Sequence, residues 1–101
     1  KQASQAITAD GSTTTAVDIL AAITEINATS ATHACAMADG ADGQVKTIIN
    51  VSTSGTNNVV ITPANLRGGT TITLNAPGET VTCLFKNSNW NVIAFNGAVI
   101  A

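Results

Sequence analysis

Short segments of alternating apolar and hydroxyl residues recur over residues 42–92, and this pattern constrains the fold more than any other feature of the chain. The segments typical of strands are residues 44–51, 59–62, 70–74, 80–85 and 90–95. In residues 71–74, Thr-Ile-Thr-Leu, one face is apolar and the other carries hydroxyls, as in a strand with one buried face. Turn residues separate the segments, at Gly55, Pro63, Gly68-Gly69 and Pro77-Gly78. The pattern predicts an all-β fold.

The length of 101 residues predicts one domain covering residues 1–101. Residues 60–62, 71–74 and 81–84 echo one another at a spacing that favours a sandwich or barrel and is too irregular for a solenoid. We therefore predict an antiparallel β-sandwich or barrel of short strands over residues 16–101. Residues 1–15 are polar and rich in Thr and Ser, with Ile7 as the only large apolar residue, which predicts an extended N-terminal arm.

Residues 16–26 fit two interpretations. Ile19, Ile23 and Ile26 share one helical face, behind a possible cap at Thr15. The same residues fit two strands broken at Ala21-Ala22. The strand-rich remainder of the chain favours the strands.

Two further strand patterns have consequences below. In the strand over residues 44–51, Val45, Thr47 and Ile49 share one face, and Lys46, Ile48 and Asn50 share the other. Near the C-terminus, Asn96-Gly97 is the strongest hairpin signal in the chain. It predicts a type I′ turn leading into an apolar terminal strand over residues 98–101.

Only 10% of the residues are charged, and the formal net charge is -2. The basic residues are scattered, so binding to nucleic acid is not expected; they are Lys1, Lys46, Arg67 and Lys86. No apolar run is long enough to cross a membrane, and the N-terminus lacks the pattern of a signal peptide. A surface with so few charges is expected to be covered by copies of the chain or by a partner.

We expect no catalytic residues, since His33 is the only base of the usual kind and no Gly-x-Ser-x-Gly motif occurs. His33, Cys35 and Cys83 fall short of the paired spacing of a zinc site, so no metal and no cofactor are expected. A metal shared through His33 on a three-fold axis stays an alternative. The two cysteines are interpreted as small buried hydrophobic residues, with one disulfide left open.

Two other groups fit a structural role better than a binding role. Asp39 and Asp42 lack the pattern of a calcium loop and predict a turn. Trp90 with Phe85 or Phe95 could stack against a sugar ring. Because the chain has only three aromatic residues, we expect the core to use all of them.

The C-terminal half resembles small β-proteins of the structural modules of tailed bacteriophages. The resemblance rests on the following segments: Asp42-Gly43-Gln44-Val45-Lys46-Thr47-Ile48, Thr62-Pro63-Ala64-Asn65, Gly69-Thr70-Thr71-Ile72-Thr73-Leu74, Gly78-Glu79-Thr80-Val81 and Trp90-Asn91-Val92. Proteins of this group look like head decoration (cement) proteins or terminal modules of head and tail fibres, all-β and commonly trimeric. Cys83 departs from the plain aliphatic residue expected there.

The resemblance implies a non-enzymatic virion protein that is made in the host cytoplasm and located on the capsid surface. We expect a homotrimer that binds the major capsid protein and stabilises contacts between its subunits. The alternative is a fibre module that contributes to receptor binding, but the chain shows no repetitive shaft. On the decoration hypothesis, the arm over residues 1–15 or the strand over residues 98–101 extends onto a neighbour by strand pairing.

Overall fold

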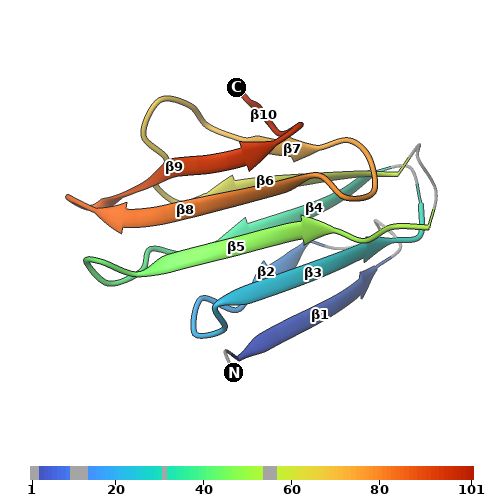
Figure 1. Cartoon of the computed structure of the whole chain (residues 1–101), viewed down its shortest axis with the longest axis horizontal. Helices are drawn as coiled ribbons and strands as arrows, with labels where there is room; N and C mark the ends of the chain where they lie inside the picture. The colour runs from blue at the N-terminus through green and yellow to red at the C-terminus, as the bar shows by residue number, and fades with distance from the viewer. Residues whose placement is uncertain (1–2, 10–13, 31, 54–56) are drawn as a thin grey trace.

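The predicted all-β sandwich is confirmed by the computed structural model, which describes residues 3–9, 14–30, 32–53 and 57–101. Two five-stranded sheets pack face to face (Figure 1). Sheet A has the strand order β1-β3-β5-β8-β9, and sheet B has the order β10-β7-β6-β4-β2. The strands are β1 (Ser4–Ala9), β2 (Thr15–Val17), β3 (Ile23–Ala28), β4 (Thr32–Met37), β5 (Val45–Asn50), β6 (Asn58–Pro63), β7 (Ile72–Leu74), β8 (Thr80–Lys86), β9 (Asn89–Asn96) and β10 (Val99–Ile100).

In its first half the chain winds as a coil, because each successive strand from β1 to β6 lies in the opposite sheet. Strands β1, β3 and β5 therefore run parallel in sheet A, and β2, β4 and β6 run parallel in sheet B. The antiparallel pairing expected from the sequence is found only later, in β5–β8, β8–β9, β6–β7 and β7–β10. Consecutive strands pair antiparallel only when a hairpin keeps both in one sheet, and the early connections cross between sheets.

The described part of the predicted N-terminal arm belongs to the sandwich. Strand β1 pairs with β3 along its whole length, and β2 pairs with β4. The remainder of the predicted arm, residues 1–2 and 10–13, lies outside the described residues. Residues 16–26 form the end of β2, a turn and the start of β3, so the interpretation as two strands is correct. The described residues contain no helix that could cross a membrane.

The core fills the space between the sheets, where strand alternation turns every second side chain inward. It combines β-branched and aliphatic residues with both thiols and two aromatic rings: Ile7, Val17, Ile26, Ala28, Cys35, Met37, Ile48, Val59, Ile61, Ile72, Leu74, Val81, Cys83, Phe85, Trp90 and Ala98. Trp90 contacts Phe85 edge to face at a centroid distance of 5.2 Å. Its indole Nε1 donates a 2.9 Å hydrogen bond to the carbonyl oxygen of Ala38.

The turn predictions hold in part. Pro77 and Gly78 form the centre of a turn closed by a hydrogen bond from the Glu79 amide to the Ala76 carbonyl, and Gly78 has the positive φ of 89° that a type II turn requires. The hairpin predicted at Asn96-Gly97 is wrong. Gly97 has a positive φ of 74°, but the chain crosses there to sheet B, where β10 pairs with β7.

Candidate interaction surface

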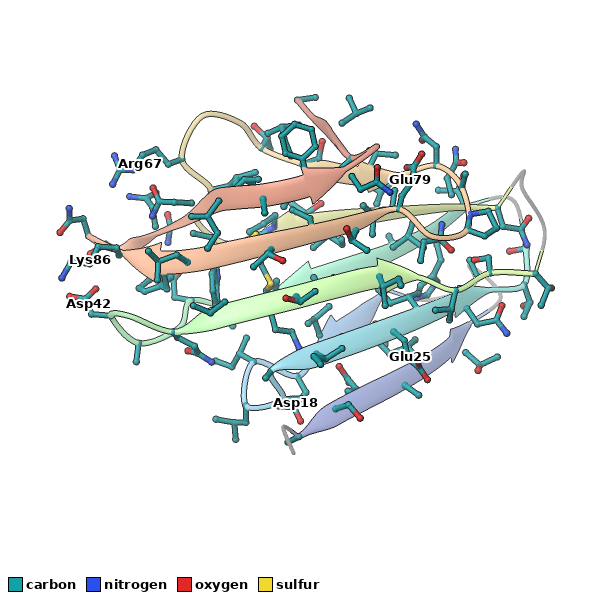
Figure 2. The ribbon with its side chains drawn as sticks, viewed as in Figure 1. Asp18, Glu25, Asp42, Arg67, Glu79 and Lys86 are labelled. Carbon is teal, nitrogen blue, oxygen red and sulfur yellow. The ribbon has the colours of Figure 1, made fainter. Side chains whose placement is uncertain are left out.

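The described charged side chains lie mostly at the ends of strands and in turns, as Figure 2 shows. Six residues share this placement: Asp18, Asp39, Asp42, Arg67, Glu79 and Lys86. Lys46 is buried in the core, and among the described residues Glu25 alone is a charge in the middle of a strand on the outer face of a sheet. The two broad faces of the sandwich are therefore nearly free of charge.

The outer face of sheet B carries no charged residue among those the structure describes. Its side chains are small or β-branched apart from one asparagine: Ala16, Thr32, Ala34, Ala36, Asn58, Val60, Thr62, Thr73 and Val99. The alanines of β4 are exposed on this face. Small side chains allow another sheet or backbone to approach closely, so this face is shaped for packing against a flat surface.

The outer face of sheet A carries larger apolar side chains, among them Ile23, Ile49 and Leu84. It consists of Ser4, Ala6, Thr8, Ile23, Glu25, Asn27, Val45, Thr47, Ile49, Thr80, Thr82, Leu84, Lys86, Asn91 and Ala94. Val45 is 47% exposed and Ile23 is 37% exposed. On the same face, the hydroxyls of Thr47 and Thr82 form a 3.0 Å hydrogen bond between neighbouring strands.

Strand β5 presents its more apolar side to solvent. Val45, Thr47 and Ile49 point outward, whereas Lys46, Ile48 and Asn50 are buried. A strand normally buries its apolar side and exposes its polar side. The reversed orientation means that apolar surface is available to a partner, and it requires the buried polar groups to be satisfied.

The Lys46 ammonium is satisfied by oxygen atoms on and beside the turn between β2 and β3. It donates hydrogen bonds to the carbonyl oxygens of Asp18, at 3.0 Å, and Ala21, at 2.7 Å, and to the hydroxyl of Thr24. Burial lowers the pKa of Lys46 to about 8, and the Asp18 carboxylate opposes part of that shift. The lysine thus ties β5 to the turn that connects the two sheets.

Asn50 is satisfied in the same way at the other end of β5. Its Nδ2 donates to the carbonyl oxygens of Leu74, at 3.0 Å, and Asn57, at 3.3 Å. Its Oδ1 accepts a 2.9 Å hydrogen bond from the Ser52 amide. Because these polar groups have partners, the strand can hold its polar side in the core.

The structure places the candidate chemical residues inside the sandwich. His33 and Cys35 lie on the inner face of β4, and Cys83 lies on the inner face of β8 in the other sheet. The His33 Nε2 is 2.9 Å from the hydroxyl of Thr15, and no described group forms a hydrogen bond with its buried Nδ1. Both thiols are free, and burial raises the pKa of each to about 11. No group of three metal-binding side chains occurs among the described residues.

Trp90 is fully buried and cannot offer a flat surface to a sugar ring. The expectation that all three aromatic residues lie in the core is correct for Trp90 and Phe85 and wrong for Phe95, which is 61% exposed. Phe95 follows the β-bulge of β9, where register with β8 shifts between Thr82 and Cys83.

Asp39 and Asp42 lie in the turn between β4 and β5, as expected. Both oxygens of the Asp39 carboxylate accept hydrogen bonds from Asn65 Nδ2, at 3.0 and 2.9 Å. Asp42 forms an exposed 3.6 Å ion pair with Lys86.

The C-terminal strand, expected to extend onto a neighbouring protein, is paired within its own sheet. The Ala101 amide donates to the Thr71 carbonyl at 3.0 Å, and the Ala101 carbonyl accepts from the Thr70 amide at 2.6 Å. Residues 98–101 are therefore not available as a free docking strand.

In comparisons with known proteins, no family model matches the chain, and no curated protein matches it.

Proposed function

We propose that this chain is a bacteriophage capsid decoration protein that binds the outer surface of the head and stabilises contacts between major capsid protein subunits. The observation that supports this proposal is the separation of charge from the two broad faces. Charges gather at the strand ends, while flat faces of Ala, Thr, Val and Ile remain for contact with other subunits. Such faces favour a structural role within an assembly.

The outer face of sheet B is the better candidate for packing between sister chains in a homotrimer. Ala16, Ala34 and Ala36 lie there and let three sheets approach one axis closely. No charge on this face has to be desolvated, so the like-charge repulsion that opposes self-packing is absent from the described face.

The outer face of sheet A is the better candidate for the capsid contact. Val45 lies opposite Leu84 on β8, and Ile49 lies two outward positions further along β5, opposite Thr80. These three side chains form an apolar strip that is interrupted by the hydroxyls of Thr47 and Thr82. One such contact is weak, but many copies on a lattice hold through high effective concentration. The mechanical result is a shell whose neighbouring subunits separate less easily under the pressure of packed genome.

The proposal is tested by adding the purified chain to phage shells that lack it and measuring occupancy by co-sedimentation. Val45→Lys places a charge in the apolar strip and is expected to abolish binding to the shells. The oligomeric state of the free protein in solution is expected to stay unchanged. Leu20→Lys is the matched control, because Leu20 is 85% exposed in a turn away from both faces. Equal binding by both variants would contradict a contact through sheet A.

A fibre module that contributes to receptor binding is the second candidate. The parallel coil of β1 to β6 favours it, since stacked coils of this kind build elongated structures. Immunogold labelling of virions separates the two functions. Decoration predicts label over the whole head, whereas a fibre module predicts label confined to appendages.

A further inference from the structure

The four edges of the two sheets differ in how far they are covered by the described residues. Strand β9 is covered at Trp90, whose amide donates to the Asn65 carbonyl and whose carbonyl accepts from the Arg67 amide, both at 2.9 Å. Beyond Trp90 a β-bulge interrupts the edge of β9. Strand β10 has only two residues. Neither edge offers a long regular row of free main-chain groups.

The edge of β2 is covered by a side chain. Gln5 reaches across from β1, accepts a 2.8 Å hydrogen bond from the Asp18 amide and donates a 3.4 Å hydrogen bond to the Ala16 carbonyl. Its amide takes the place that a peptide group of a neighbouring strand would occupy. Sheet B is therefore closed at this edge.

Among the residues that the structure describes, nothing covers the outer edge of strand β1. The Ala3 carbonyl accepts hydrogen bonds from the Ala22 and Ile23 amides beside it, at 3.0 and 3.4 Å, so Ala3 faces β3. Because alternate residues of a strand bond to the same neighbour, the amides of Ser4, Ala6 and Thr8 point away from β3. In Figure 1, β1 forms the lower border of the front sheet.

None of the devices that protect an edge occurs in β1. Its six residues, Ser-Gln-Ala-Ile-Thr-Ala, include no charge, proline or glycine, and its pairing with β3 has no bulge. Natural proteins block free edges with such features, since an unprotected strand recruits another one. A regular row of free main-chain N–H and C=O groups is complementary to another extended strand, so this edge suits a strand as its partner.

We propose that the occupant is β1 of a second copy of this chain, paired antiparallel about a two-fold axis at Ala6. The outward row of β1 suits pairing with itself. Ala6 would lie opposite Ala6 of the second copy, and Ser4 would lie opposite Thr8, giving one small pair and two hydroxyl pairs. An isologous contact of this kind joins two copies only, and it uses a different surface from the proposed trimer contact through sheet B, so the two contacts together would join one trimer to another.

Electrostatics does not oppose the pairing. Glu25 is the nearest described charge on this face, since it lies beside Ala6 in the register of β1 and β3. The two copies of Glu25 would be separated by three strand spacings, about 14 Å. That distance exceeds the Debye length of about 8 Å at physiological ionic strength.

The area of sheet A also favours a second copy. Five strands of about six residues give a face on the order of 500 Å², at about 4.8 Å between strands and about 3.3 Å per residue. A stable interface buries about 800 Å² on each partner. Two paired copies form one continuous sheet with a face on the order of 1,000 Å². This last argument rests on the proposed capsid contact, whereas the edge contact itself does not.

Disulfide trapping tests the contact directly. In an antiparallel hydrogen-bonded pair the facing Cα atoms are about 5.5 Å apart, which suits a disulfide. Ala6→Cys is therefore expected to form covalent dimers under mild oxidation. Ala94→Cys is the control, because Ala94 is exposed on the same face of sheet A at its opposite edge. Failure of Ala6→Cys to cross-link, or equal cross-linking of both variants, would overturn the proposal.

A second variant removes the amide at the centre of the contact. Ala6→Pro keeps the ladder to β3, because the lost N–H points to solvent and proline is tolerated on edge strands. In the unsubstituted chain, the amides of Ser4 and Thr8 should be protected from hydrogen exchange in proportion to protein concentration. Ala6→Pro should abolish that protection, and at concentrations too low for pairing its melting temperature should equal that of the unsubstituted chain. Protection that persists would overturn the proposal. Loss of shell binding with cross-linking intact would count against capsid decoration alone.

Discussion

The Lys46 ammonium lies 2.7 Å from the main-chain carbonyl oxygen of Ala21, and both residues are buried. Lys46 belongs to β5 of sheet A, and Ala21 lies in the turn that brings the chain from sheet B into sheet A. This hydrogen bond fixes the side of β5 that faces the core. It therefore also fixes the exposure of Val45 on the proposed contact face.

Two substitutions of Lys46 distinguish the contribution of its hydrogen bonds to stability from the contribution of its packing. Lys46→Met keeps most of the side-chain volume and leaves acceptors unpaired, so we expect a loss of about 1–3 kcal/mol in the free energy of unfolding. Lys46→Ala adds a cavity, for which losses of about 2–5 kcal/mol are typical. Urea unfolding followed by Trp90 fluorescence measures both. A smaller loss for alanine than for methionine would contradict the packed geometry.

The lowered pKa of Lys46 makes stability depend on pH. Between pH 8 and the ordinary value of 10.5, the unfolded chain holds a proton at this lysine that the folded chain has released. The contribution of this group to stability is therefore fully present above pH 10.5 and lost as the pH falls through 8. The stability of the unsubstituted chain relative to Lys46→Met should rise from pH 8 to pH 10. A flat difference would show that the ammonium is hydrated.

The buried thiols make the stability of the fold change with pH in the opposite direction. Burial raises the pKa of Cys35 and Cys83 from 9.0 to about 11, so above pH 9 the unfolded chain releases protons that the folded chain keeps. Stability from the thiols is present below pH 9 and is lost as the pH rises toward 11. The variant with both cysteines replaced by alanine should lack this alkaline loss in pH-dependent unfolding. An unchanged loss of stability at alkaline pH would mean that groups other than the two thiols cause it.

Neighbouring isoleucines of β5 test its orientation. Ile48 is fully buried, whereas Ile49 lies on the outer face. Ile48→Ala is expected to lower the free energy of unfolding by about 2–5 kcal/mol, as for other buried aliphatic residues. Ile49→Ala should cost less than about 1 kcal/mol in the free subunit. Chemical denaturation of the two variants measures the difference, and the reverse order would mean that β5 buries its other side.

The sequence predicts the strands of the second half well, because alternation and turn residues are local signals. The segment expected over residues 80–85 is found as β8, and the turn at Gly78 follows from its positive φ. Pairing partners are not local. An alternating strand has a buried face whether its neighbours run parallel or antiparallel, so nothing in β1 to β6 indicated the coil.

The candidate surface was harder to predict for a similar reason. Alternation separates Val45 from Lys46 but does not state which side is buried. Hydropathy favours burying Val45, and the outcome depends instead on acceptors from a turn about 25 residues away in sequence. The Asn96-Gly97 pair failed as a hairpin signal because the edge of β7 captures the strand that follows it.

The capsid contact has a direct test in an image of the virion at side-chain resolution. Decoration through sheet A predicts that the chain covers the head surface, with Val45 and Ile49 of β5 facing the major capsid protein and β1 paired with β1 of a second copy. A chain found only on an appendage, or bound to the head with the outer face of sheet A open to solvent, would contradict it.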